Sequence, residues 1–158
     1  MARVRRPVGE PAQLPLIAES TPAGVVRQRR RSTLPDSRVA AVAKEVEAMA
    51  EADRWEGANA VHLVVLYLKL HLEVYGVEAS DCGPADRLAA IGVATNMLGR
   101  DFDGDAALMA EFVWWTWERE KGAEKWRREN HRPGRRVTWQ LQFSQRLLTD
   151  YRVHLARR

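Results

Sequence analysis

The sequence has little cysteine and no long hydrophobic run. Cys82 is the only cysteine among 158 residues, which excludes a disulfide scaffold and a cysteine-based zinc finger and suits a reducing compartment. The longest strongly apolar run, 63–68, is far shorter than the roughly 20 residues that a membrane-spanning helix needs. Three arginines near the N-terminus are not followed by the apolar core of a signal peptide. We therefore expect a soluble, cytoplasmic protein with no membrane partner.

Motifs of enzymes are also missing. No glycine-rich loop has the spacing that holds phosphates. Cys82 has no histidine near it in the sequence, so it is either a small core residue or an exposed thiol rather than a nucleophile. We expect no enzymatic activity, no catalytic residue and no cofactor.

Metal sites are not supported either. His62 and His71 are nine residues apart, which places them on roughly opposite sides of a helix, where they cannot share one ion. The acidic turn 101–105 begins like a calcium loop, but Ala106 and Phe112 stand where that loop needs glycine and glutamate. The turn is therefore expected to end in a helix cap, and we expect no metal.

Charge is divided into three zones along the chain. Residues 1–35 contain seven arginines and two glutamates, a net charge of +5. Residues 36–118 contain six basic and fifteen acidic residues (−9), and residues 119–158 contain twelve basic and four acidic residues (+8). A local basic zone creates a field that the total charge of +4 conceals, and it favours a polyanionic partner.

The sequence predicts an arm over residues 1–35 and a helical domain over residues 36–158. Five of the seven prolines lie within residues 1–35, without any apolar period, which predicts a flexible Pro/Arg-rich arm. Residues 36–158 show apolar spacings of three and four, so we predict an all-α fold: a compact bundle of five to six helices.

The expected helices begin at residues suited to caps and first turns. Asp36 or Ser37 is expected to cap the first helix, and a second helix over about 58–75 is apolar nearly all round and hence central. Pro84 suits a first turn, and Gly99 suits a position just past a helix end. The next helix, from about 106, either breaks at 122 or continues to about 130. A last helix is predicted from about 137, with strands over 66–74 or 138–143 as alternatives.

Six tryptophans are many for this length. Trp114, Trp115 and Trp117 spread over about 160° of a helix and cannot share one narrow stripe. They are expected either to fill the core or to reach a second helix layer, a partner or a base.

The segment 125–136 is the strongest candidate for a binding site. It concentrates guanidinium groups, which neutralise phosphates and release counterions, and it includes an aromatic ring that offers a stacking face. The alternative is that these cations only neutralise the acidic middle zone. The expected contacts with DNA or RNA are Lys125, Trp126, Arg127, Arg128, Arg132, Arg135 and Arg136, together with a second cluster in the arm, Arg27, Arg29, Arg30 and Arg31.

A short apolar segment of the arm, Gln13-Leu-Pro-Leu-Ile17, resembles the motif by which bacterial replication and repair proteins dock on the sliding clamp. The resemblance covers five residues, and Ile17 departs from the more usual phenylalanine. It implies a sliding clamp as a partner, contacted by Gln13, Leu14, Leu16 and Ile17. The alternative is that the segment folds back on the chain's own helices.

These observations favour a non-enzymatic, nucleic-acid-associated accessory protein of a larger nucleoprotein assembly. No spacing typical of a helix-turn-helix assigns a recognition helix. The alternative is a structural adaptor, in a phage or another large complex, whose tryptophans and arm make protein–protein contacts.

Overall fold

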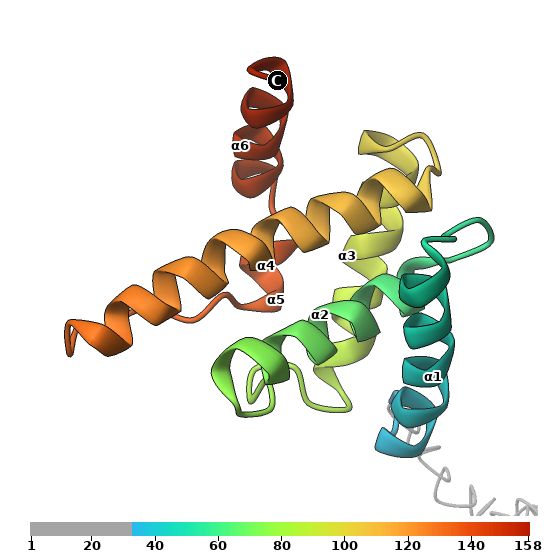
Figure 1. Cartoon of the computed structure of the whole chain (residues 1–158). Coiled ribbons are helices and arrows are strands. Elements are labelled where there is room, and N and C mark those ends of the chain that lie inside the picture. The colour runs from blue at the N-terminus through green and yellow to red at the C-terminus, as the bar shows by residue number, and fades with distance from the viewer. Residues whose placement is uncertain (1–32) are drawn as a thin grey trace, which may run out of the picture. The chain divides into compact units, whose positions relative to one another are not determined.

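The computed structural model describes residues 33–158, which form six helices and no strand (Figure 1). The expected all-α fold of five to six helices is therefore confirmed. The arm residues Gln13, Leu14, Leu16, Ile17, Arg27, Arg29, Arg30 and Arg31 lie outside the described residues. The helices are α1 (Asp36–Ala52), α2 (Ala60–Tyr75), α3 (Asp86–Asp101), α4 (Ala106–Glu129), α5 (Trp139–Gln142) and α6 (Gln145–Ala156).

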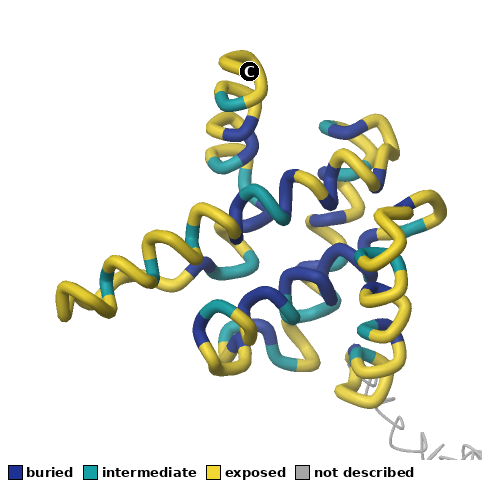
Figure 2. Tube along the Cα trace, in the orientation of Figure 1, coloured by how far each residue is buried: buried dark blue, intermediate teal, exposed yellow. Residues whose placement is uncertain are grey.

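The α2 helix is the centre of the bundle. It contacts α1, α3, α4 and α5, and it is buried on nearly every side, as its all-round apolar sequence predicts (Figure 2). Asn59 caps its start by accepting from the backbone N–H of Val61, and His62 Nδ1 accepts from the backbone N–H of Asn59 in return. The alternative that residues 66–74 form a strand is wrong, because these residues lie within α2, a helix that is buried on nearly every side.

Two expectations about helix ends are wrong. The α1 helix has no side-chain cap, because Asp36 is already helical and its carboxylate pairs with Arg87 of α3 at 2.7 Å. Gly99 lies within α3 rather than beyond it, and a Cβ at Gly99 would meet nothing within 4 Å. The α3 helix ends instead at the 101–105 turn, where Asp105 caps α4 by accepting from Leu108 N–H at 2.9 Å.

The C-terminal region is two helices where the sequence predicted one. Thr138 caps α5 by accepting from Leu141 N–H, and Ser144 caps α6 by accepting from Leu147 N–H. The polar caps divide the predicted helix, and the strand alternative for 138–143 is also wrong. Phe143, which falls off the apolar stripe of a continuous helix, is buried at the junction.

The α4 helix runs past the rest of the bundle (Figure 1). Gly122 does not break it, and a Cβ there would meet nothing within 4 Å. Its first half carries the buried residues Phe112 and Trp117, whereas from residue 118 to its end no residue is buried (Figure 2). No helix within residues 33–158 is both long and apolar enough to cross a membrane.

Candidate functional site

The basic segment 125–136 forms the last turn of α4 and most of the loop that leads back to α5. His131 adopts a left-handed conformation (φ 51°), and the next backbone N–H, of Arg132, donates to Arg127 O at 3.0 Å. This hydrogen bond closes α4 as a Schellman-type cap, with histidine at the position that glycine usually occupies. The cap reverses the chain, so that the loop runs back along the end of α4.

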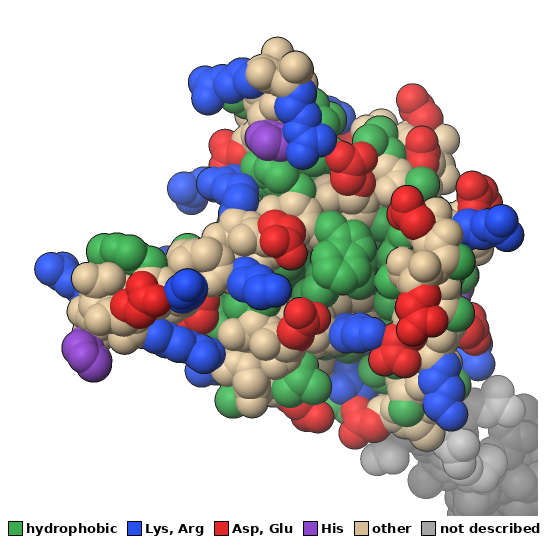
Figure 3. Space-filling view, in the orientation of Figure 1, with side chains coloured by type: hydrophobic (Ala, Val, Ile, Leu, Met, Phe, Trp, Pro, Cys, Tyr) green, Lys and Arg blue, Asp and Glu red, His purple; other side chains and the backbone are tan. Residues whose placement is uncertain are grey.

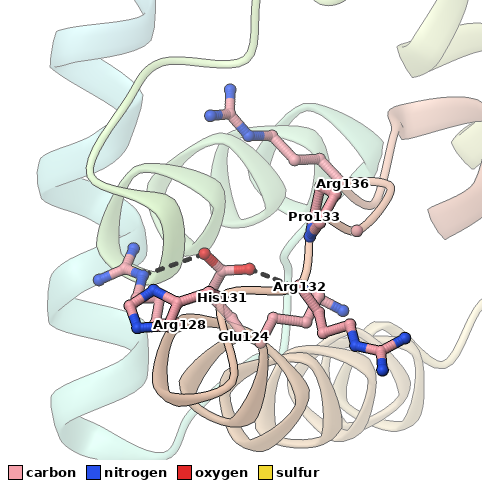
Figure 4. A pocket seen from close by; sticks show the side chains of 8 residues that line it. Glu124, Arg128, His131, Arg132, Pro133 and Arg136 are labelled. Atoms are coloured by element: carbon pink, nitrogen blue, oxygen red, sulfur yellow. Dashed lines mark hydrogen bonds and ion pairs between the residues drawn. The ribbon is translucent and has the colours of Figure 1, made fainter.

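Helix and loop together enclose an open, cationic cleft of about 530 Å³. In Figure 4, α4 supplies Glu124 and Arg128 to one wall, and the loop supplies Arg132, Pro133 and Arg136 to the other. Four guanidinium groups and one carboxylate line the cleft, so its net charge is +3 before His131 is counted. Its lining residues are Glu124, Arg127, Arg128, His131, Arg132, Pro133, Gly134 and Arg136.

Arg127 is fixed within the wall of this cleft. Its side chain is only 17% exposed, and its Nη2 donates to Glu120 and, at 2.9 Å, to Glu124. Burial opposes the charge of Arg127, but the hydrogen bonds to Glu124 and Glu120 raise its pKa. A Cβ on Gly134 would overlap Arg127 Cδ, so the loop lies directly on the arginine side chain. Arg127 is thus held by two carboxylates and covered by the loop.

Tyr75 joins the loop to α2 and α4. Its hydroxyl donates to Glu120 Oε1 and accepts from the backbone N–H of Val137, each at 2.7 Å. Burial is the main cause that raises the pKa of Tyr75, so the phenol stays protonated and keeps donating. Tyr67 adds a hydrogen bond to Val137 O at 3.3 Å. The loop is therefore anchored at Gly134 and again at Val137.

The remaining cations of the segment differ from Arg127. Arg128 is 61% exposed, and it pairs with Glu124 at 3.0 Å. Arg132, Arg135 and Arg136 are exposed, and within residues 33–158 none of them forms an ion pair. Arg136 lies over the ring of Tyr75, with Cζ at 5.5 Å from the centroid. These guanidinium groups are open to an anion.

Trp126 and Lys125 do not line the cleft. Trp126 follows Glu124 by two residues, which turns it about 200° around the helix, away from the cleft. It is 56% exposed. Lys125 contacts Glu129 at 4.0 Å. The structure thus brings together four of the seven residues expected in this segment, and Arg135 lies beside them on the loop.

A second groove lies on the other side of Arg128. It has about 500 Å³ and runs between the end of α2 and α4. Three carboxylates (Glu73, Glu124, Glu129) offset three cations (Lys121, Lys125, Arg128), so it has no net charge. The cationic cleft is therefore the better anion site of the two.

The other tryptophans pack within the bundle. Trp55 and Trp117 are buried, and Trp114, Trp115 and Trp139 are half-buried. Trp115 forms a second layer, because its ring packs against Tyr151 and His154 of α6 at centroid distances of 5.2 and 5.5 Å. Only Trp126 among the six is exposed.

Within residues 33–158 no group of three or more metal-ligating side chains comes together. The carboxylate of Asp101 pairs with Arg100 and Arg152. Cys82 is buried, and burial raises the pKa of its thiol to about 11, so it stays protonated. Of the two readings of Cys82, the small core residue is therefore correct.

Three residues of the cleft region were missed by the sequence analysis: Tyr75, Glu120 and Glu124. Glu124 precedes Arg127 and Arg128 by three and four residues, and this spacing is typical of helical ion pairs. That signal was present in the sequence. Tyr75 gives no such signal, because it lies 62 residues before its partner Val137.

Comparisons with protein families, curated proteins and solved structures find no match to this chain.

Proposed function

We infer that this chain is a non-enzymatic accessory protein that binds the phosphate backbone of a nucleic acid through the cationic cleft. The observation that carries the proposal is the cleft itself, in which the loop brings arginines to the end of a projecting helix. Arg128, Arg132 and Arg136 are assigned to phosphate contacts, with Arg135 beside them. The arm cluster 27–31 supplies further contacts.

The charge balance supports this assignment. Arg127 is neutralised by ion pairs with Glu120 and Glu124. In contrast, three arginines have no carboxylate partner within residues 33–158: Arg132, Arg135 and Arg136. The carboxylates that pair with this segment lie within 119–158, so its ion pairs do not neutralise the acidic zone 36–118. A guanidinium group with free donors suits phosphate oxygens, to which it donates two parallel hydrogen bonds.

Among residues 33–158, His131 supplies the only aromatic ring in the lining of the cleft, and this composition indicates how the cleft would bind a nucleic acid. Because Trp126 faces away, the cleft offers donors and the imidazole of His131 but no indole on which a base could stack. Backbone contacts position a protein without reading sequence. We therefore expect binding that depends on salt and little on sequence.

The test is a fluorescence-anisotropy titration of duplex DNA, single-stranded DNA and RNA with the wild-type chain and with Arg132→Ala/Arg136→Ala. Each lost phosphate contact makes the negative slope of log K against log salt shallower by about 0.7–0.9, so the slope of the double variant should be shallower by about 1.4–1.8. Arg54→Ala/Arg146→Ala removes the same charge from exposed arginines elsewhere and is the matched control. If both double variants changed the slope by the same amount, the effect would come from total charge rather than from the cleft. That result would contradict the assignment of the cleft.

The adaptor function is a second candidate, and exposed Trp126 favours it. Large aromatic side chains are enriched where proteins bind one another. An adaptor predicts association that survives high salt, because buried aromatic area is poorly screened.

The sliding clamp stays a proposed partner of the arm through Gln13, Leu14, Leu16 and Ile17, and clamp binding should be lost in Leu14→Ala/Leu16→Ala.

A further inference from the structure

One face of α4 is covered over its first half only. At Trp115 this face packs against Tyr151 and His154 of α6. It continues beyond α6 with residues at spacings of four, three and four: Arg119, Gly122 and Trp126, with Ala123 beside Gly122. These four are all exposed, and Trp126 is exposed to 56%. We call residues 115, 119, 122, 123 and 126 the outer face of α4.

The outer face combines an arginine stacked on a tryptophan, two small residues and an exposed indole ring. Arg119 lies over the ring of Trp115, with Cζ at 4.6 Å from the centroid. The small residues Gly122 and Ala123 follow, and a Cβ at Gly122 would meet nothing within 4 Å. Small side chains let a second helix approach at the short end of the usual 8–10 Å between axes. Beyond them Trp126 offers a large apolar ring.

We propose that the outer face of α4 binds the same face of a second copy of this chain, with the two helices antiparallel about a twofold axis beside Gly122 and Ala123. In that register Trp126 faces the partner subunit's Arg119, and Arg119 faces the partner subunit's Trp126. Such self-complementarity is what a twofold interface requires. Each guanidinium group is then enclosed between its own Trp115 and the partner subunit's Trp126, and cation–π attraction strengthens when it is desolvated.

The charges beside the outer face fit the same register. Glu118 and Lys125 are exposed on one flank of α4, and within residues 33–158 the one ion pair of Lys125 is its 4.0 Å contact with Glu129. A twofold axis brings like flanks together, which places Lys125 close to the partner subunit's Glu118. Opposite charges therefore meet on the flank of the pair.

The space available also fits a second copy. The α4 helix ends at Glu129, and the register places that end beside the partner subunit's Trp115, where α6 already packs. From Trp115 to Glu129 is fourteen residues, or about 21 Å of helix. A helix of the same length fills this stretch and stops at α6. The contact area of one helix pair is at the low end for stable interfaces, so we expect a concentration-dependent dimer.

The experiment is sedimentation velocity of the full-length, nuclease-treated chain in about 0.5 M salt, where electrostatic bridging through nucleic acid is screened. Wild type should form a dimer as concentration rises. Gly122→Glu, which has room in the monomer, and Trp126→Ala should abolish it. Gly99→Glu is the matched control, because Gly99 is also a helical glycine with open space around it, and its dimer should persist.

Circular dichroism of each variant verifies that the helices remain. A wild-type monomer at every concentration, or a dimer that Gly122→Glu leaves unchanged, would overturn the proposal. The proposal would also be overturned if the outer face of the wild-type chain bound a different protein and never a second copy.

A charge exchange tests the register independently. Lys125→Glu places a carboxylate against the partner subunit's Glu118 and should weaken the dimer. The double variant Glu118→Lys/Lys125→Glu restores opposite charges and should recover it. Failure of the double variant to recover the dimer would rule out the antiparallel register.

Discussion

The four arginines of the cleft are held in different ways. Arg127 is enclosed by two half-buried carboxylates, so losing the arginine would leave Glu120 with only the Tyr75 hydroxyl and Glu124 with only Arg128 among the partners described above. Arg132 and Arg136 have no such partner within residues 33–158 and keep their donors for a ligand. Arg127 therefore positions the wall of the cleft, whereas its neighbours face the solvent that an anion would replace.

The contact between Gly134 and Arg127 gives the first prediction. Gly134→Ala puts a Cβ where Arg127 Cδ lies, so the arginine must leave its carboxylates or the loop must move. Overpacking of this kind costs about 1–3 kcal/mol, which urea unfolding would measure. Gly99→Ala, a helical position with open space, should instead gain about 0.5–1 kcal/mol. A neutral Gly134→Ala would show that the loop does not rest on Arg127.

The left-handed conformation of His131 gives the second prediction. A residue with a Cβ at φ 51° loses about 1 kcal/mol relative to glycine, so His131→Gly should raise the free energy of unfolding by about that amount. Asp53 caps α1 at φ 49°, and Asp53→Gly should gain less, because aspartate tolerates this region better. If His131→Gly lowered stability, the imidazole would be making a contact that outweighs its backbone strain.

At the scale of elements, α2 places a titratable group in the aromatic centre of the bundle. The ring of His71 is surrounded by Tyr67, Tyr75 and Trp117 at centroid distances of 6.0, 4.7 and 5.8 Å. Its Nδ1 donates to Val77 O at 2.9 Å, just beyond the helix end. Burial lowers the pKa of His71 and outweighs that hydrogen bond, which acts in the opposite direction. The core therefore favours the neutral imidazole.

This environment predicts acid sensitivity. Because the pKa of His71 is lower in the folded chain than in the unfolded one, the unfolded state binds more protons as the pH falls below about 6.5, and stability decreases. The slope has a limit of about 1.4 kcal/mol per pH unit for one group. Urea unfolding between pH 7 and 5 should show a steeper decline for wild type than for His71→Gln. Parallel slopes for the two proteins would refute the role of burial.

The helices themselves followed well from sequence where the apolar pattern was long. The all-round apolar run of α2 predicted a central helix, and the turn before Asp105 predicted a cap, and both are correct. Gly99 was misassigned because glycine also occurs within helices whose packing offsets its entropy cost. The division between α5 and α6 was missed because Ser144 caps a helix only once the chain bends there, and Phe143 drives that bend by entering the core.

At the scale of the whole molecule, the C-terminal half of α4 has two faces with different chemistry. One carries the cationic cleft and the other carries exposed Trp126 (Figure 3 shows this end of the helix with blue, red and green side chains side by side). The sequence predicted the basic segment but treated its arginines and its tryptophan as one site. The helical turn of about 200° between Glu124 and Trp126 separates the two faces, and the loop, which Tyr75 holds through Val137 across 62 residues, brings Arg132 and Arg136 to the side of Glu124. No local pattern encodes a contact of that separation.

The central claim is that the cleft binds phosphate. The most direct measurement is the salt dependence of anisotropy for a labelled duplex with wild type and with Arg132→Ala/Arg136→Ala. Four phosphate contacts predict a wild-type slope of about −3.6 or steeper on a duplex, and the slope of the double variant should be shallower by about 1.8. No binding at low salt, or a slope that the double variant leaves unchanged, would contradict the claim.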